Sequence, residues 1–139
     1  SLFEGLIFLD PGKEDIVKKV KEITSGFGTD VVITACPAKQ AQVEAFSIIA
    51  PRGRISFFGG LPKDDSTILI DSNTIHYNEI SVFGAFASNK PDYQKAADLI
   101  SSRKIDPSKF ITKVISLEDI EKGIRLVKEG SVLKVVVKI

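Results

Sequence analysis

The sequence predicts an α/β fold built on a mostly parallel sheet. Strand-like and helix-like segments alternate along the chain, which is the order that a parallel sheet with crossover helices requires. Two apolar runs, 55–58 and 80–83, stop at small residues, Gly59–Gly60 and Gly84–Ala85. Apolar strands that end in small residues are typical of the edge where an α/β sheet opens onto a binding crevice. We therefore expect a ligand to bind at the ends of these strands.

The first half of the chain opens with a short apolar run, after which the sequence period changes. From Glu14 the apolar residues fall on one helical face and the lysines on the other. Gly26 and Gly28 end that helix, and the β-branched run 31–33 suits a buried parallel strand. The elements expected here are strands at 5–9, 31–33 and 55–58, helices at 14–23 and 38–49, and a turn at 51–54.

The second half continues the alternation. Residues 67–75 alternate apolar and polar side chains, as a half-exposed edge strand does. Lys90–Pro91–Asp92 and Leu117–Glu118–Asp119 each stand at the start of a helical pattern, and Gly130 ends the second one. The expected elements are an edge strand at 67–75, a strand at 80–83, helices at 90–100 and 117–127, and a closing strand at 132–139.

Composition limits the classes of function. A chain of 139 residues with 43% hydrophobic residues is long enough for a globular core. The net charge of +1, with both signs scattered, gives no reason to expect nucleic acid or an anionic membrane as partner. No apolar stretch approaches the ~20 residues of a membrane span, and we expect no signal peptide. The single cysteine, Cys36, excludes an intrachain disulfide and favours a reducing, cytoplasmic location.

The small residues after the strands are the candidate binding residues. Without a Cβ, Gly59 and Gly60 let a ligand approach the backbone, although Gly-Gly before Leu61–Pro62 is also a turn signal. The segment 84–87 would offer backbone donors and acceptors to a ligand. Phe86 within it suits a core or interdomain position equally well.

Side chains of catalytic type are few. Cys36 has no histidine partner nearby in the sequence, so packing is the preferred interpretation. His76 lies near the predicted edge strand, where a structural or interface role is preferred over metal ligation. These two residues cannot complete a structural zinc site by themselves. We expect no catalytic residue and no metal ligand within this chain.

From about Thr29 onward, a series of segments follows a recognisable order and spacing. The order resembles that of the zinc-containing medium-chain alcohol and polyol dehydrogenases, the family of sorbitol and threonine dehydrogenases. No single segment is specific, and the resemblance depends on their succession over nearly the whole chain. The segments are 28–33, 52–55, 75–80, 92–93, 104–107, 110–113, 117–120 and 134–137.

The resemblance implies a partial Rossmann-type coenzyme domain, doubly wound and mostly parallel, that lacks its first two strands. Residues 1–87 would be this partial dinucleotide-binding domain. Residues 88–139 would be the helix and C-terminal return segment that packs on the catalytic domain of the parent enzyme. The glycine-rich phosphate loop and the zinc ligands would lie upstream, outside this chain. Lys113 stands where relatives often carry histidine.

The resemblance also implies a function. The parent would pass hydride from a secondary alcohol or polyol to NAD or NADP, with zinc polarising the alcohol oxygen. This chain would help to position the nicotinamide and would be inactive alone. The implied cofactor-binding residues are Ala35, Cys36, Pro37, Gly59, Gly60, Leu61, Gly84, Ala85, Phe86 and Ala87.

Two partners are expected. The first is the missing N-terminal catalytic domain, and the second is another copy of the chain, joined through the edge strand near Ile68–Ile75. Because the first two strands are missing, the strand at 31–33 loses its neighbour. We expect the run 5–9 to re-pair with the sheet, or another chain to cover this edge. Two alternative functions stay open: a zinc-free relative such as a quinone reductase, and a self-standing, non-catalytic binding or assembly module.

Overall fold

The computed structural model describes residues 5–139, which form two compact units divided between Phe86 and Ala87. Residues 1–4 of the predicted coenzyme-domain part, 1–87, lie outside the described range. Each unit contains a parallel sheet of its own, one with three strands and one with two. The prediction of an α/β fold with parallel strands is therefore confirmed.

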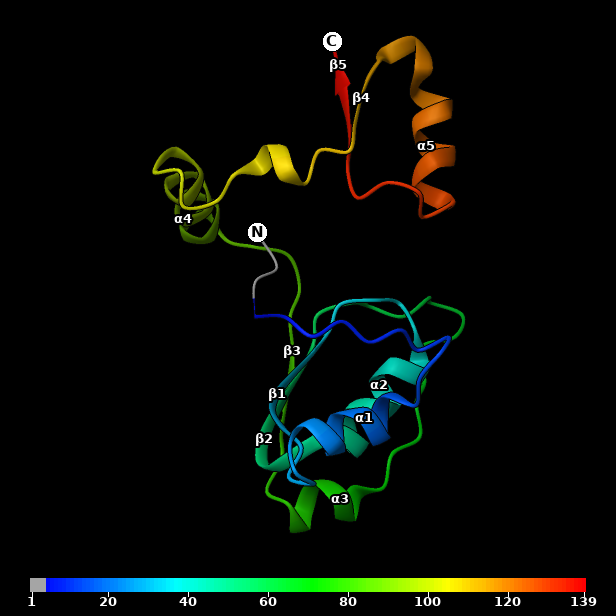
Figure 1. Ribbon diagram of the computed structural model, residues 1–139, viewed down its shortest axis with the longest axis vertical. Helices are drawn as coiled ribbons and strands as arrows, with labels where there is room; N and C mark the ends of the chain where they lie inside the picture. The colour runs from blue at the N-terminus through cyan, green and yellow to red at the C-terminus, as the bar shows by residue number, and fades with distance from the viewer. Residues whose placement is uncertain (1–4) are drawn as a thin grey trace. The chain divides into compact units, whose positions relative to one another are not determined.

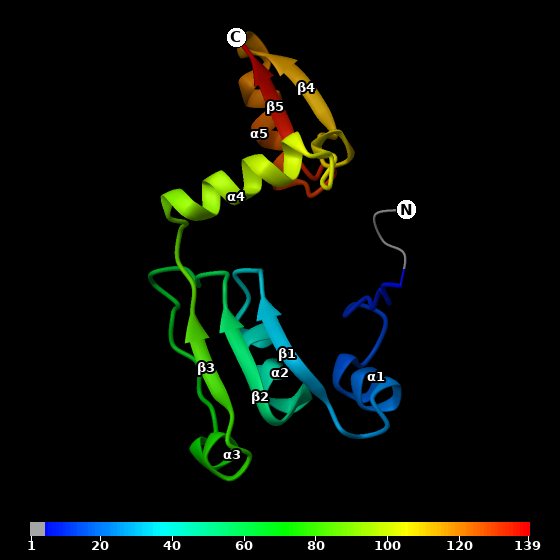
Figure 2. The ribbon, with the colours of Figure 1, turned by 90° about the vertical axis from the view of Figure 1, so that its left-hand side faces the viewer.

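The first unit holds a three-stranded parallel sheet in the order β1–β2–β3 (Figures 1 and 2). In the register of this sheet, Thr34, Phe57 and Gly84 are partners at the carboxyl ends of the strands. The three strands therefore end side by side at one edge. The elements are α1 (Ile16–Ile23), β1 (Thr29–Thr34), α2 (Lys39–Ile48), β2 (Ile49–Phe57), α3 (Ser72–Tyr77) and β3 (Ser81–Gly84).

The core of this unit lies between α2 and the sheet. Ala45 of α2 and Ile55 of the central strand are fully buried, and Ile80 joins them. Phe46 and Phe57 close the cluster with an edge-to-face contact, their ring centroids 6.3 Å apart. Aromatic pairs in this geometry add to the stabilisation that burial of their area provides. The contact fixes α2 over β1 and β2, on one face of the sheet (Figure 2).

The opposite face of the sheet is open. Side chains alternate between the two faces along a strand, so Ile33 and its neighbours in register point away from Ile55. Val31, Ile33 and Phe83 are 45%, 62% and 53% exposed, although they belong to the apolar runs of β1 and β3. Three apolar side chains on one sheet face indicate a surface that has the composition of a core.

The first helix, α1, has a capping residue at its start and ends before the expected glycine. Asp15 caps α1 by accepting a hydrogen bond from the Lys18 N–H at 3.0 Å. Beyond the end of this helix, Gly26 has a φ of +84°, which a residue with a Cβ rarely adopts. The predicted turn at 51–54 lies inside β2, which starts at Ile49 and carries a local distortion with φ of +63° at Arg52.

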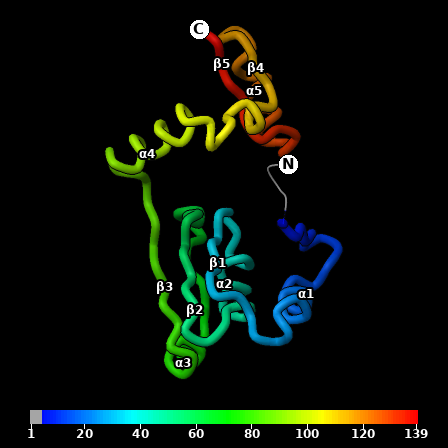
Figure 3. The backbone as a smooth tube through the Cα atoms, turned by 60° about the vertical axis from the view of Figure 1, so that its left-hand side comes forward, coloured from blue at the N-terminus to red at the C-terminus, as the bar shows by residue number. Residues whose placement is uncertain are grey.

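The predicted edge strand at 67–75 is wrong. Residues 66–71 are irregular, and Ser72–Tyr77 form the short helix α3, through which the chain passes from β2 into β3 (Figure 3). The Asp71 side chain accepts a hydrogen bond from the Asn73 N–H at 2.9 Å and caps this helix. The capping side chain offers the backbone a local partner, which favours a helix start over a strand. Within the described residues, the edges of the sheet are β1 and β3.

The predicted strand at 5–9 is also wrong, and so is its expected re-pairing with β1. Residues 6–10 are irregular, and β1 pairs only with β2 within the described part of the chain. A strand exists only as part of a sheet ladder, and the ladders among residues 5–139 do not include this apolar run. Coverage of the β1 edge by another chain stays a prediction.

The second unit contains a two-stranded parallel sheet that packs against one helix, α5 (Ile120–Lys128). In this sheet β4 and β5 pair from Lys113 with Val135 to Ser116 with Lys138. The predicted strand at 132–139 is confirmed in part, since β5 starts at Val135, and the four-residue strand β4 was not predicted because it is too short to show a period. The elements are α4 (Lys90–Ser101), η1 (Pro107–Lys109), β4 (Lys113–Ser116), η2 (Leu117–Asp119), α5 (Ile120–Lys128) and β5 (Val135–Lys138).

The two predicted helices of this unit are confirmed. Asn89 and Asp92 form a reciprocal capping box at the start of α4: the Asp92 N–H donates to Asn89 Oδ1 at 3.0 Å, and the Asn89 N–H donates to Asp92 Oδ2 at 3.2 Å. Pro91 follows at the start of the helix, where its missing N–H is not needed. In α5, Gly123 contacts the sheet and Ile115 of β4 is buried beneath it.

Candidate functional site

Three loops leave the carboxyl edge of the first sheet and carry the predicted binding residues. Ala35–Pro37 follow β1, Gly59–Leu61 follow β2, and Gly84–Phe86 end and follow β3. The parallel register brings these nine residues to one edge of the sheet. The tenth predicted residue, Ala87, lies just beyond the division between the two units and has a φ of +57°.

The first two loops are locked together at Gly59. Its N–H donates to the Thr34 carbonyl oxygen at 2.6 Å, just before the β1 loop begins. A Cβ built on Gly59 would lie 2.8 Å from both the amide nitrogen and the carbonyl oxygen of Cys36. Backbone atoms cannot yield as a side chain can, so only glycine fits at this position. The glycine at 59 thus permits close packing of the two loops.

Two buried polar residues support this arrangement, and sequence reasoning missed both. Thr34 is 4% exposed, and its hydroxyl lies 3.4 Å from the Ser56 carbonyl oxygen. Gln42 is 5% exposed, and its Nε2 donates to the Gly59 carbonyl oxygen at 3.1 Å. The signal for Gln42 was its position three and four residues before the inward-facing Ala45 and Phe46, on the same helical face.

The neighbouring glycines face open space. A Cβ on Gly60 or on Gly84 would meet no atom within 4 Å. The Gly60 N–H has no hydrogen-bond acceptor among residues 5–139. The carboxyl edge of β2 therefore presents an unpaired backbone donor beside free volume, which is what a bound ligand with an acceptor group requires.

The third strand extends the same edge. The Ala85 N–H donates to the Phe57 carbonyl oxygen at 3.1 Å, so the ladder between β2 and β3 continues one residue past β3. Phe86 is fully exposed, which makes the core alternative for this side chain wrong. Its ring is available to a ligand or to another protein surface.

A surface ion pair links the helix after β1 to the loop after β2. Lys39 at the start of α2 pairs with Asp65, and both side chains are at least one-third exposed. Exposed pairs of this kind contribute little to stability because water and salt screen them. The pair nevertheless connects the segment after Gly60 to α2, in addition to the hydrogen bond from Gln42 to the Gly59 carbonyl oxygen.

The described residues offer no metal centre. Within residues 5–139 there is no group of three or more His, Cys, Asp or Glu side chains that could hold a metal ion. Cys36 lies at the carboxyl edge of the sheet, whereas His76 lies in α3, just before the amino end of β3 (Figure 2). The His76 ring contacts the Tyr77 ring at a centroid distance of 4.8 Å.

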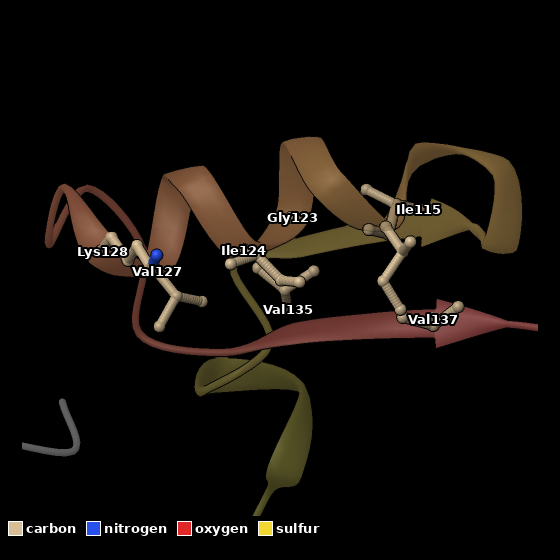
Figure 4. A pocket seen from close by; sticks show the side chains of 8 residues that line it. Ile115, Gly123, Ile124, Val127, Lys128, Val135 and Val137 are labelled. Carbon is tan, nitrogen blue, oxygen red and sulfur yellow. The ribbon is translucent and has the colours of Figure 1, made fainter.

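A second candidate surface is an apolar groove of about 410 Å³ in the second unit. Figure 4 shows side chains of α5, among them Ile124 and Val127, extending over the strand that carries Val135 and Val137. The only charged group along it is Lys128, so the groove lacks an acid or a nucleophile and suits packing rather than chemistry. It is lined by Ile115, Ile120, Gly123, Ile124, Val127, Lys128, Val135 and Val137.

No helix among residues 5–139 is long and apolar enough to cross a lipid bilayer.

Known proteins match this chain over most of its length. An uncharacterized zinc-type alcohol dehydrogenase-like protein of Haemophilus influenzae is 34% identical over 112 residues, covering 81% of this chain and 32% of that protein. The solved structure of 2R,3R-butanediol dehydrogenase from Bacillus subtilis is 28% identical, with a TM-score of 0.81 over 97% of this chain and 38% of its own. An NADP-bound protein of Sinorhizobium meliloti 1021 is 23% identical and has the same fold, with a TM-score of 0.81 over 93% of this chain and 38% of its own.

These similarities cover only part of the other proteins. The chain spans about a third of the length of the curated relatives it matches. It corresponds to the partial Rossmann-type α/β fold that the sequence predicted, and the resemblance to zinc-containing medium-chain dehydrogenases is confirmed. Residues 6–102 match the family described as zinc-binding dehydrogenase. This chain therefore belongs to the zinc-binding dehydrogenase family.

Proposed function

We propose that this chain is the cofactor-positioning part of a dehydrogenase that transfers hydride from a secondary alcohol or polyol to NAD or NADP. The observation that carries the proposal is the convergence of three loops at the carboxyl edge of the first sheet, where the Gly60 N–H has no acceptor among residues 5–139 and faces open space. In parallel α/β sheets this edge is where nucleotide cofactors bind. The names of relatives that act on sorbitol, arabitol phosphate and butanediol support a polyol or secondary alcohol as substrate.

The described residues fit the nicotinamide half of such a cofactor. They offer backbone groups and small side chains at the strand ends, which can fix a planar ring and a ribose without chemistry of their own. Gly60 would bind the ribose through its N–H, and 84–87 would hold the ring carboxamide through backbone groups. When bound, the nicotinamide supplies the hydride acceptor. The choice between NAD and NADP lies with residues outside this set, although NADP is bound to the Sinorhizobium protein of the same fold.

The described residues do not fit a zinc site, since no three suitable ligands lie together among residues 5–139. In the proposed parent, zinc would be held by other residues, on an N-terminal catalytic domain. The second unit is the part proposed to contact that domain, and its apolar groove supplies a surface of the right character. This assignment predicts that the chain alone has no dehydrogenase activity. The absence of a disulfide pair supports a cytoplasmic location.

We propose that copies of the chain associate through an exposed apolar side chain, and not through the edge strand that the sequence predicted. The segment 68–75 is not a strand, so pairing of strand edges does not support an oligomer there. Leu69 in this segment is nonetheless 92% exposed, so its side chain is available for a contact between copies. Analytical ultracentrifugation across concentrations, with Leu69→Ser as the comparison, tests it. A chain that stays monomeric at high concentration would contradict the proposal.

The proposed function is tested by titrating the ¹⁵N-labelled chain with NAD and NADP, with adenosine monophosphate as the control ligand. We expect weak binding that shifts the amide signals of 35–37, 59–61 and 84–87, and no such shifts with adenosine monophosphate. Shifts elsewhere, or none, would contradict the proposed site. An alcohol-dependent rise in NADH absorbance with this chain alone would contradict its inactivity.

The parent protein is tested by sequencing the source DNA upstream of this chain. An in-frame extension that encodes a G-x-G-x-x-G loop and Cys, His and Glu zinc ligands is the expected result. A stop codon directly upstream would instead favour a non-catalytic binding or assembly module. Metal analysis of the intact parent separates a zinc enzyme from a zinc-free quinone reductase-like relative.

A further inference from the structure

We infer that Gln42 is a positioning residue, which holds the Gly59–Gly60 peptide so that the Gly60 N–H faces the nicotinamide half of the cofactor. The inference rests on the proposed function and adds to it a residue of α2 that does not touch the cofactor itself. Gln42 would act only through the peptide that it orients.

Two hydrogen bonds, one to each side of Gly59, orient the peptide between Gly59 and Gly60. The Gly59 N–H is bonded to the Thr34 carbonyl oxygen at 2.6 Å, and the Gly59 carbonyl oxygen accepts a hydrogen bond from Gln42 Nε2 at 3.1 Å. Every peptide bond between described residues is trans. In a trans peptide the N–H points opposite to the C=O. Because the Gly59 carbonyl points toward α2, the Gly60 N–H points away from it.

The Gly60 N–H faces open space. Residue 60 is exposed, no acceptor among residues 5–139 reaches its N–H, and a Cβ there would have no neighbour within 4 Å. The donor is thus directed into open space at the carboxyl edge of β2. A ligand with a neutral oxygen acceptor, such as a ribose hydroxyl or a carboxamide oxygen, satisfies it.

The peptide between Gly59 and Gly60 needs a clamp because it joins two glycines. Glycine accepts positive and negative φ almost equally, so a peptide between two glycines flips more easily than any other. A flip of this peptide would turn the Gly60 N–H toward α2, and this donor would no longer face a ligand. The bond from Gln42 opposes the flip, because it would be broken and would leave a buried amide without its partner.

The burial of position 42 favours an apolar side chain, yet the residue there is a glutamine. Position 42 lies on the inward face of α2, beside the buried Ala45 and the aromatic Phe46, where an apolar side chain would pack without loss. Burial of a primary amide costs free energy unless it is hydrogen-bonded. The bond to the Gly59 carbonyl oxygen accounts for a polar residue at this position. The exposed Gln40, two residues earlier, bonds only to Glu44 on its own helix.

The test uses nicotinamide mononucleotide as the probe, because it contains the half of the cofactor that these loops would hold. The ¹⁵N-labelled chain and its Gln42→Met variant are titrated with the probe, and dissociation constants are taken from amide shifts. Methionine keeps the length of the side chain and removes the donor. Gln40→Met is the matched control on the same helix. Phe46→Leu is a second control, which weakens the packing against Phe57 but leaves the clamp in place.

We expect the Gly60 amide to shift strongly when the probe binds the natural chain. Gln42→Met should raise the dissociation constant about tenfold and reduce the Gly60 shift, because a freely flipping peptide presents its donor only part of the time. Gln40→Met and Phe46→Leu should bind like the natural chain, although Phe46→Leu lowers the thermal stability. A purely structural role of Gln42 would instead make Phe46→Leu and Gln42→Met behave alike.

Two results would overturn the inference, and they are distinguishable. If Gln42→Met binds the probe as tightly as the natural chain, Gln42 does not position the peptide, and the proposed function stands. If the probe shifts no signal at the carboxyl edge of the natural chain, the proposed function fails and the inference with it. If Gln42→Met fails to fold, the titration of the natural chain is the test. A bound probe that shifts the amide signals of 35–37 and 84–87 but not that of Gly60 excludes the positioning role of Gln42.

Discussion

The backbone of Cys36 occupies the space that a β-carbon of Gly59 would need. Such a carbon would lie 2.8 Å from the Cys36 nitrogen and 2.8 Å from its carbonyl oxygen. The loops after β1 and β2 are therefore in direct backbone contact, and the bond from the Gly59 N–H to the Thr34 carbonyl oxygen holds them there. This contact brings two segments, 23 positions apart in the chain, into one candidate site.

Gly59→Ala should destabilise the first unit by about 1–3 kcal/mol, because neither the Cys36 backbone nor the end of β2 can move without breaking the ladder. Urea unfolding followed by circular dichroism measures the loss. The matched control is Gly60→Ala, where a Cβ meets open space and no positive φ is needed. That variant should be neutral or gain up to about 1 kcal/mol from a less flexible unfolded chain. Equal effects of the two substitutions would contradict the packing role of Gly59.

Ile55→Ala should cost about 2–5 kcal/mol, because its side chain is fully buried between α2 and the central strand and its removal leaves a cavity. Ile33→Ala removes the same number of atoms from the open face, where the side chain is 62% exposed. It should cost less than about 1 kcal/mol. The comparison is made by thermal unfolding of the purified chain. A large loss from Ile33→Ala would show that something covers this face in solution, such as a second copy.

Arg103→Gly should stabilise α4 by about 0.5–1 kcal/mol. The helix ends in a Schellman motif, in which the Lys104 N–H donates to the Leu99 carbonyl oxygen and the Arg103 N–H to the Ile100 carbonyl oxygen. This motif requires the φ of +58° observed at Arg103, a conformation that strains a residue with a Cβ. Hydrogen exchange of the α4 amides measures the gain. Lys104→Gly, one residue later and without positive φ, should give no such gain; slower exchange in both variants would argue against strain relief.

The Asp106 carboxylate should titrate below its ordinary range. Hydrogen bonds from the Ser108 hydroxyl at 2.6 Å and from the Ser108 N–H at 3.0 Å lower the pKa of Asp106, with a smaller contribution from the Lys109 charge. Because the folded-state pKa is lowered, this carboxylate stabilises the fold above its unfolded pKa of about 4, and the contribution is lost as the pH falls through the folded value. Ser108→Ala should raise the pKa of Asp106, and Ser108→Thr, which keeps the hydroxyl, should not. Carboxyl ¹³C NMR titration provides the measurement, and an unchanged pKa in Ser108→Ala would refute the assignment.

Local signals in the sequence predicted the helices α1, α2, α4 and α5 and the ends of β1 and β2, whereas the short helix α3 was not predicted. The capping residues Asp15 and Asn89 and the terminating Gly26 act within a few residues of themselves, so their effect does not depend on the rest of the fold. The strands at 31–33 and 55–58 were also predictable, since both consist of apolar or β-branched runs that end at small residues. The candidate site at the carboxyl edge follows from their parallel order alone.

The sequence by itself therefore determined the α/β class, the helices α1, α2, α4 and α5, the strands β1, β2 and β3, and the edge at which the glycines gather. Tertiary structure decided which apolar runs became strands: 5–9 and 67–75 have the pattern but join no sheet ladder among residues 5–139, and a strand exists only within such a ladder. It also decided the roles of Gly59 and Gln42, because close approach and burial depend on segments far apart in the chain. Contacts of that kind leave no periodic trace in the sequence, and only the packed molecule shows them.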